Sequence, residues 1–118
     1  MFDLTGKTAI VTGGNGGIGL GFARGLARSG ANVAIWGRNT DKNDAARTEL
    51  SELTDVLALQ CDVGDEDDII QAFAETVDRF GRVDSVFANA GIGASSRFTE
   101  MTLEEWRDIF RINMEGVF

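Results

Sequence analysis

The sequence contains no proline, histidine or tyrosine, and it has only one cysteine. A single cysteine, Cys61, excludes an internal disulfide and argues against a cysteine-based zinc site, so we predict no metal centre. No stretch reaches the roughly 18 apolar residues of a membrane span. Residues 1–7 do not form a signal peptide, because no basic segment leads into an apolar run. We therefore expect a cytoplasmic protein with no membrane partner.

Basic residues are also scarce. The sequence has 11 Lys and Arg residues against 19 Asp and Glu residues, which gives a net charge of −8. This balance argues against a nucleic-acid partner, because such surfaces carry an excess of basic residues. Because the net negative charge of the chain repels a phosphate-bearing ligand, nearby donors or cations must hold such a ligand. The length of 118 residues suits one domain, and 43% hydrophobic with 25% charged residues is an ordinary globular composition.

Short apolar runs alternate with helical patterns along the chain. Strands are expected at residues 8–11, 32–36, 56–60 and 83–88, and helices at residues 17–29 and 41–53, between the caps Asp65 and Gly81, and after Thr102. Strands that alternate with helices imply a parallel sheet with right-handed crossovers. The predicted fold class is α/β: one Rossmann-type domain over residues 1–118, with about four βα units, helices flanking the sheet and the strand order 3-2-1-4.

Local patterns also predict helix caps and buried faces. The acidic run 65–68 is expected to cap a helix and complement its dipole rather than bind a cation. Thr102 and Glu105 have the spacing of a capping box for the last helix, where Trp106 and Phe110 are expected in the core or in a subunit contact. An apolar stripe before Gly81 is expected to face the core: Ile69, Ile70, Phe73, Val77 and Phe80.

The segment between the first strand and the first helix is rich in glycine, and it reads Thr12-Gly13-Gly14-Asn15-Gly16-Gly17-Ile18-Gly19. Glycines permit a tight turn and a close approach of the backbone to a pyrophosphate, and the helix N-terminus offers N–H groups and the positive end of a dipole. The alternative is a glycine-rich turn without a ligand. Gly17, Gly21 and Gly25 recur every four residues, so we expect this face to pack closely on the sheet.

The loop resembles the cofactor loop of the short-chain dehydrogenases/reductases, Thr-Gly-x-x-x-Gly-Ile-Gly, and further matches follow in order. Asp62-Val63 is similar to the family's adenine-contacting pair. Asn89-Ala90-Gly91 resembles its Asn-Asn-Ala-Gly motif, with Ala88 in place of the first Asn, and Asn113 resembles the helix asparagine of the catalytic tetrad. The resemblance covers essentially the whole chain. It implies hydride transfer between a nicotinamide cofactor and a carbonyl or secondary alcohol, with this set holding the cofactor: Gly13, Asn15, Gly16, Gly17, Ile18, Gly19, Arg38, Asp62, Val63, Asn89, Ala90 and Gly91.

Each downstream match has a second interpretation. Asp62 follows a strand at the edge where open α/β sheets bind ligands, but an aspartate there is also a common loop cap. The Asn89 amide can both line the cofactor channel and tie two loops together. The resemblance implies that Asn113 holds a water in a proton relay to a lysine. The alternative is a core asparagine paired with backbone, because buried polar groups are generally hydrogen-bonded.

Cofactor choice is expected to be decided after the second strand. An acid at this place binds the ribose 2′-hydroxyl of NAD, whereas NADP requires a cation. By resemblance the position of the acid is Gly37, followed by Arg38, which can pair with a 2′-phosphate. This favours NADP(H). Gly16 stands where many NADP-dependent relatives carry a second basic residue, so NAD(H) stays possible, and a solvated surface arginine is the alternative role for Arg38.

The serine, the tyrosine and the lysine of the family's Tyr-x-x-x-Lys motif are expected beyond residue 118, since this sequence has no tyrosine. We therefore expect a truncated or cleaved part of an enzyme that acts on an alcohol or ketone. The alternatives are a non-catalytic dinucleotide-binding module and an inactive fragment. The resemblance also implies a homo-oligomer, dimer or tetramer, joined through the last helix.

Overall fold

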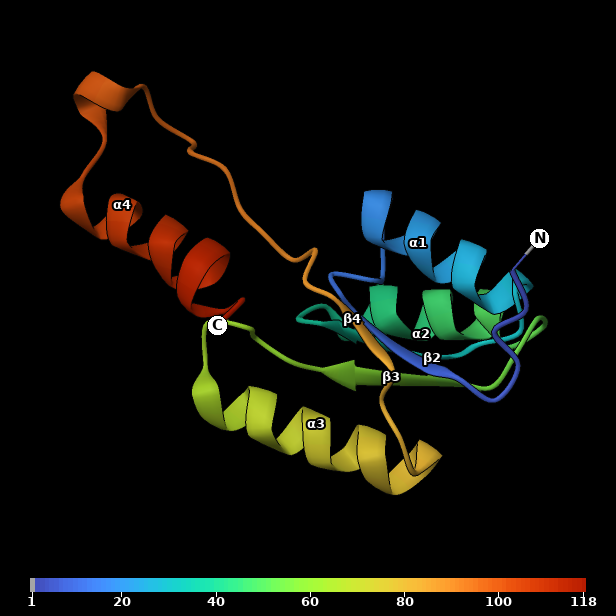
Figure 1. Cartoon of the computed structure of the whole chain (residues 1–118). Coiled ribbons are helices and arrows are strands. Elements are labelled where there is room, and N and C mark those ends of the chain that lie inside the picture. The colour runs from blue at the N-terminus through green and yellow to red at the C-terminus, as the bar shows by residue number, and fades with distance from the viewer. Residues whose placement is uncertain (1) are drawn as a thin grey trace.

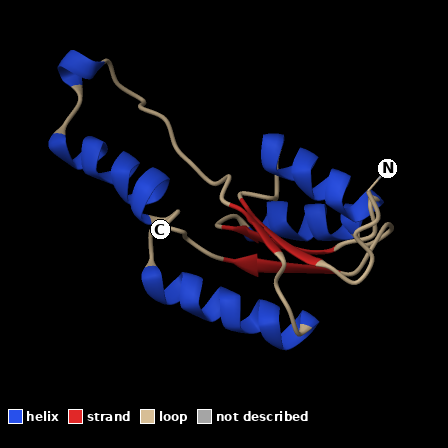
Figure 2. Cartoon of the chain, in the orientation of Figure 1, coloured by secondary structure: helices blue, strands red, loops and turns tan. Residues whose placement is uncertain are grey.

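The computed structural model describes residues 2–118 and contains one sheet of four parallel strands in the order β3-β2-β1-β4. The strands are β1 (Thr8–Thr12), β2 (Asn32–Gly37), β3 (Val56–Gln60) and β4 (Ser85–Phe87). Helices α1 (Gly17–Arg28) and α2 (Thr40–Leu50) lie on one face of the sheet, and α3 (Glu66–Phe80) lies on the other (Figures 1 and 2). The predicted fold class and strand order are confirmed.

Two apolar layers hold the sheet between its helices. Successive side chains of a strand point to opposite faces, so Val11 and Ile35 pack toward α1 and α2, whereas Ile10 and Ala34 pack toward α3. Both faces are therefore buried, which explains why β1 and β2 are almost wholly apolar. Within residues 2–118 no helix is both long and apolar enough to cross a bilayer.

The caps of α3 are those that the sequence predicts. The Asp65 carboxylate accepts hydrogen bonds from the backbone N–H groups of Asp67 and Asp68, and Gly81 ends the helix with φ of 76°. Left-handed backbone of this kind favours glycine. The acidic run thus caps a helix, as expected.

The buried face of α3 differs from the predicted apolar stripe. Ile70 and Phe73 are 59% and 46% exposed, whereas Ala72 and Thr76 are buried. The Trp36 indole donates to the Thr76 hydroxyl at 3.2 Å, so a large aromatic side chain of the sheet occupies the space next to these two small residues. The helix turns its small face toward the bulky strand residue, and the stripe prediction is wrong for Ile70 and Phe73.

The contact face of α1 was also predicted wrongly. Gly17, Gly21 and Gly25 are exposed, and a Cβ added at any of them would meet nothing within 4 Å. The buried residues of α1 are Gly19, Ala23 and Ala27, and the two alanines pack on the sheet. They are offset by two positions from the predicted set, which places them about 200° away around a helix of 3.6 residues per turn.

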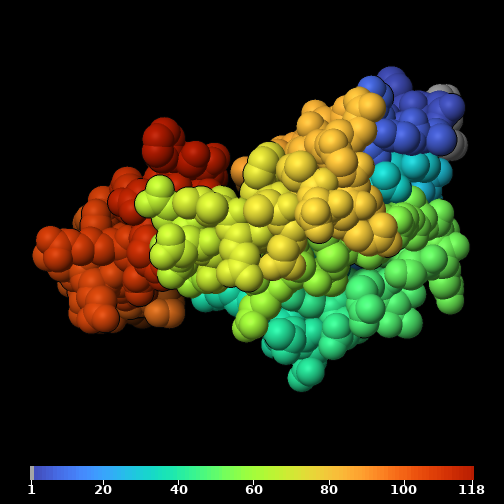
Figure 3. Space-filling view, turned by 90° about the horizontal axis from the view of Figure 1, so that it is seen from below, coloured from blue at the N-terminus to red at the C-terminus, as the bar shows by residue number. Residues whose placement is uncertain are grey.

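The segment from Phe98 to Phe118 stands out at one end of the molecule (Figure 1). Figure 3 shows these residues, orange to red, next to the yellow-green start of α3. They form a 3-10 turn (Phe98–Glu100), α4 (Leu103–Phe110) and a π-helical turn (Arg111–Glu115). Trp106 and Phe110 stack on each other with ring centroids 4.8 Å apart and remain 43% and 42% exposed, so neither lies in a core of the described residues.

The predicted capping box is half formed. The Thr102 hydroxyl accepts from the Glu105 N–H, but the Glu105 carboxylate does not return to Thr102. It accepts instead from the hydroxyl and backbone N–H groups of Ser96 and Ser95, and these bonds lower the pKa of Glu105 to about 2. The glutamate therefore ties α4 to the extended segment that follows β4.

Replacing two glycines of α1 by alanine should change the free energy of unfolding in opposite directions. Gly21→Ala should raise the free energy of unfolding by about 0.5–1 kcal/mol, because the site is open and alanine is the better helix former. Gly19→Ala should lower it, because the new Cβ would overlap the Gly13 carbonyl and the Asn89 amide. Urea denaturation of both variants checks this, and equal shifts of the same sign would contradict the packing described.

Candidate functional site

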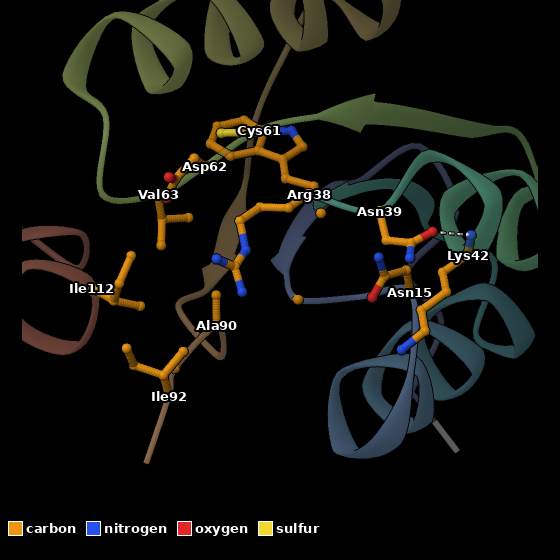
Figure 4. Close-up of a pocket in the computed structure, with 14 residues that line it drawn as sticks. Asn15, Arg38, Asn39, Lys42, Cys61, Asp62, Val63, Ala90, Ile92 and Ile112 are labelled. Atoms are coloured by element: carbon orange, nitrogen blue, oxygen red, sulfur yellow. Dashed lines mark hydrogen bonds between the residues drawn. The ribbon is translucent and has the colours of Figure 1, made fainter. Parts of the chain in front are cut away.

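A pocket of about 340 Å³ opens at the carboxyl edge of the sheet, where the loops after the four strands meet. It joins residues that are far apart in the sequence, and Figure 4 shows them around one space. Seven of the predicted cofactor residues line it: Gly13, Asn15, Arg38, Asp62, Val63, Ala90 and Gly91. The other predicted residues lie outside its lining: Gly16, Gly17, Ile18, Gly19, Asn89 and Asn113.

The glycine loop turns tightly from β1 into α1. Gly13 and Gly17 have φ of 65° and 52°, a conformation that glycine adopts without strain. Gly16 caps α1 through its backbone alone, and the first turn of the helix has no acidic side chain. The first N–H groups of a helix lack partners within it, so this end presents donors and a positive dipole to an anion.

Asn89 holds the glycine loop against the end of β4. Its Nδ2 donates to the Thr12 carbonyl oxygen at 3.1 Å, and the Thr12 hydroxyl accepts from the N–H groups of Asn89 and Ala90 at 3.0 and 2.9 Å. The Gly19 α-carbon lies against the same amide. The contacts of Asn89 are therefore those of a loop tie, which is one of the two roles expected for it.

Asp62 makes local contacts and also borders the pocket. Its Oδ1 accepts from the Gly64 N–H at 2.9 Å, and its Oδ2 lies 3.7 Å from the Arg111 guanidinium. Its own N–H donates to the Asp68 carboxylate at 2.9 Å. The loop-cap interpretation of Asp62 accounts for these bonds, and Val63 beside it supplies an apolar wall.

Asn113 lies in the π-helical turn, a rare geometry that often occurs at functional sites. Its Oδ1 accepts from the Ile92 N–H at 2.9 Å and its Nδ2 donates to the Ile92 carbonyl at 2.8 Å. Both polar atoms thus pair with backbone, as the core-asparagine alternative predicts. The pair anchors the last helix to the segment after β4 and so helps to close the pocket beside Gly91.

Two basic side chains reach the pocket. Arg38 extends into its middle, and Lys42 lies on the same side as Asn15 (Figure 4). Neither has a carboxylate within 4 Å among residues 2–118. Lys42 was not predicted from the sequence, although it follows Arg38 by four residues. Arg38 precedes the N-cap Asn39 and Lys42 lies in the first turn of α2, so the start of this helix brings both to the pocket.

The sequence interpretation missed other lining residues as well. They are Trp36, Asn39, Cys61, Ile92 and Ile112, together with Gly37, which was named only as the position of a missing acid. Most are apolar or uncharged residues at strand ends, and no motif distinguishes them from ordinary core residues. Their role follows from the place where the parallel strands end.

Cys61 lies 2% exposed at the end of β3, as expected for a small hydrophobic residue. Burial, together with the nearby carboxylates of Asp68, Asp62 and Asp65, raises the pKa of its thiol to about 11. The thiolate is the reactive form of cysteine, so this group is unreactive near neutral pH.

Alkylation should test this environment. At pH 8 the folded protein should react with iodoacetamide far more slowly than the same protein in denaturant, because about 0.1% of a thiol with this pKa is ionised there. Between pH 7 and pH 9 the native rate should rise about tenfold per pH unit without a plateau. Rapid labelling of the folded chain at pH 8, followed by mass spectrometry, would contradict a buried thiol.

Known proteins with similar sequences belong to the family that the glycine loop resembles. The family model described as short chain dehydrogenase matches residues 7–118. The NADP-dependent (R)-specific alcohol dehydrogenase of Lentilactobacillus kefiri is 40% identical over 115 residues, which are 98% of this chain and 46% of that protein. The chain thus spans about half the length of the curated relatives it matches.

Solved structures agree on the fold and differ in cofactor. An alcohol dehydrogenase from the archaeon Thermococcus sibiricus, complexed with 5-hydroxy-NADP, is 34% identical with a TM-score of 0.89, over 94% of this chain and 48% of that one. An NAD⁺-bound xylitol dehydrogenase is 31% identical with a TM-score of 0.92, over 98% and 45%. Both NADP and NAD thus occur among the similar proteins.

Proposed function

The chain belongs to the short-chain dehydrogenase family, and on that premise we propose that the complete protein is a cytoplasmic, NADP(H)-dependent oxidoreductase. In this proposal residues 1–118 carry the cofactor-binding half, and the substrate is a small alcohol or ketone. The observation that carries the proposal is Arg38, a cation without a carboxylate partner among residues 2–118, in a pocket bordered by the glycine loop.

The residues present fit a dinucleotide. The glycine loop leaves a backbone cradle that side chains would fill, since a Cβ at Gly16 or Gly17 would meet nothing within 4 Å. The α1 N-terminus and the loop N–H groups suit a pyrophosphate, and Val63 and Ile112 suit the faces of an aromatic base. When bound, a nicotinamide dinucleotide supplies the hydride chemistry.

The same residues have separate tasks in this proposal. The loop and α1 hold the pyrophosphate, and Asp62 and Val63 border the adenine. Asn89, Ala90 and Gly91 form the strand end that would line the cofactor channel, and Asn113 keeps that segment in place through Ile92. We retain a proton-relay role for Asn113 as part of the proposal by family resemblance.

The preference for NADP(H) is supported by charge. No carboxylate stands at Gly37, and Arg38 and Lys42 border the same pocket in a chain whose net charge is −8. An arginine can pair with a 2′-phosphate through two charge-assisted bonds, and a lysine adds a point charge. Lys42 takes the place of the basic residue that is missing at Gly16.

Arg38→Asp should reverse the cofactor preference. The substitution removes the phosphate partner and adds a repulsive carboxylate, so NADPH affinity should fall about 100-fold while NADH affinity falls little or rises. Titration calorimetry with both cofactors measures this in the 118-residue chain, and rates with NADP⁺ and NAD⁺ measure it in the complete protein.

Arg28→Asp is the matched control. Arg28 is exposed at the far end of α1, and its replacement changes the net charge by the same amount. A general effect of charge would weaken NADPH binding equally in both variants. An unchanged ratio of NADPH to NADH affinity in Arg38→Asp would remove Arg38 from cofactor selection.

A non-catalytic dinucleotide-binding module is the second candidate, and the absence of tyrosine from these residues favours it for the isolated chain. Tight NADPH binding without turnover by the complete protein would support the module. Absence of cofactor binding by the complete protein would contradict both the enzyme and the module. Oxidation of secondary alcohols with reduction of NADP⁺ would support the enzyme.

We also propose that the complete protein is a homo-oligomer joined through α4. The helix exposes Leu103, Trp106 and Phe110, which are 60%, 43% and 42% accessible. Exposed apolar side chains gathered on one helix are typical of an association surface. Sedimentation of the complete protein distinguishes a monomer from a dimer or tetramer.

A further inference from the structure

Asn43 is a buried polar residue in the first turn of α2, with 3% of its surface exposed. Its Nδ2 donates to the Gly37 carbonyl oxygen at 2.9 Å and to the Leu59 carbonyl oxygen at 3.1 Å. Its Oδ1 accepts from Asn15 Nδ2 at 2.8 Å. One side chain therefore joins the ends of β2 and β3 to the glycine loop.

The same network occupies the space beside Gly37. A Cβ added there would lie 2.7 Å from Asn43 Oδ1 and closer still to Asn15 Nδ2. Gly37 has no positive φ, so its backbone would accept another residue, and the three atoms nearest to such a Cβ all belong to the two amides. Position 37 is where an acid would meet the ribose 2′-hydroxyl of NAD.

We propose that Asn43 is a positioning residue for the glycine loop of the cofactor site. It holds Asn15, and through it the glycine loop, against the end of β2, and the pair of amides reserves position 37 for glycine. The inference rests on the proposed function. It makes the residue type at position 37, where an NAD-selecting acid would stand, depend on two uncharged side chains, because an acid can enter this position only after Asn15 moves.

The hydrogen bonds of Asn43 and Asn15 predict that an acid at position 37 does not by itself improve the binding of NADH. In the 118-residue chain, Gly37→Asp should weaken binding of NADPH and NADH alike, by about tenfold or more, because it displaces Asn15 and disturbs the loop. Gly37→Asp combined with Asn15→Gly should bind NADH about tenfold more tightly than Gly37→Asp alone. Equal NADH affinity of the single and double variants would overturn the proposal.

The coupling of the two amides is measured by a double-mutant cycle. Asn43→Ala should weaken NADPH and NADH binding by the same factor of about ten, and adding Asn15→Ala should cost less than Asn15→Ala costs alone. Thr54→Val is the control, because it removes another polar tie, from Thr54 Oγ1 to the Ala31 carbonyl at 2.8 Å, before β3 starts and far from the pocket. Additive losses in the cycle would contradict the coupling.

Hydrogen exchange of the cofactor-free chain separates this inference from the proposed function. In Asn43→Ala the amides of residues 13–18 should exchange about tenfold faster, while Thr54→Val leaves them unchanged at a comparable loss of melting temperature. Faster loop exchange in Asn43→Ala, with a complete protein that binds neither cofactor, would refute the proposed function and preserve the positioning role. Tight cofactor binding with unchanged loop exchange and affinity in Asn43→Ala would refute the positioning role alone.

Discussion

The Asn89 amide, bonded to the Thr12 carbonyl oxygen, joins two strand ends that lie 77 residues apart in the sequence. It brings the loop after β4 against the loop after β1, and the Thr12 hydroxyl completes the tie by accepting from two backbone N–H groups. Gly19 is pressed against the same place. The position of the α1 N-terminus relative to the pocket therefore depends on this contact, because any side chain at Gly19 would push the helix away.

On its other side the glycine loop is also held by hydrogen bonds between polar side chains. Asn15 reaches across to Asn43, whose amide also satisfies carbonyl groups at the ends of β2 and β3. A buried amide with an unpaired group costs about 1–3 kcal/mol, so all partners must be present together. The glycine loop is thus held from both sides, by Asn89 toward β4 and by Asn43 toward β2.

Sequence patterns predicted the fold closely and the buried faces less well. Alternating strands and helices, the cap at Asp65 and the stop at Gly81 rest on contacts within a few residues, and the structure confirms them. The stripe through Ile70 and Phe73 failed because Trp36 fills the sheet surface beneath α3, so small residues face it. The glycine face of α1 failed for a related reason, since repetition by itself does not say which side of a helix meets the sheet.

By itself the sequence determined the order of the elements, the strand arrangement and the family, because these follow from periodicity, local caps and the spacing of the glycine loop. Only the tertiary structure decided that Asn43 contacts Asn15, that Lys42 joins Arg38 at the pocket, and that Glu105 ties back to Ser96. The physical reason is that parallel strands bring their carboxyl ends to one edge. Loops separated by tens of residues then share one small volume, where side-chain pairing depends on distances that no sequence spacing records.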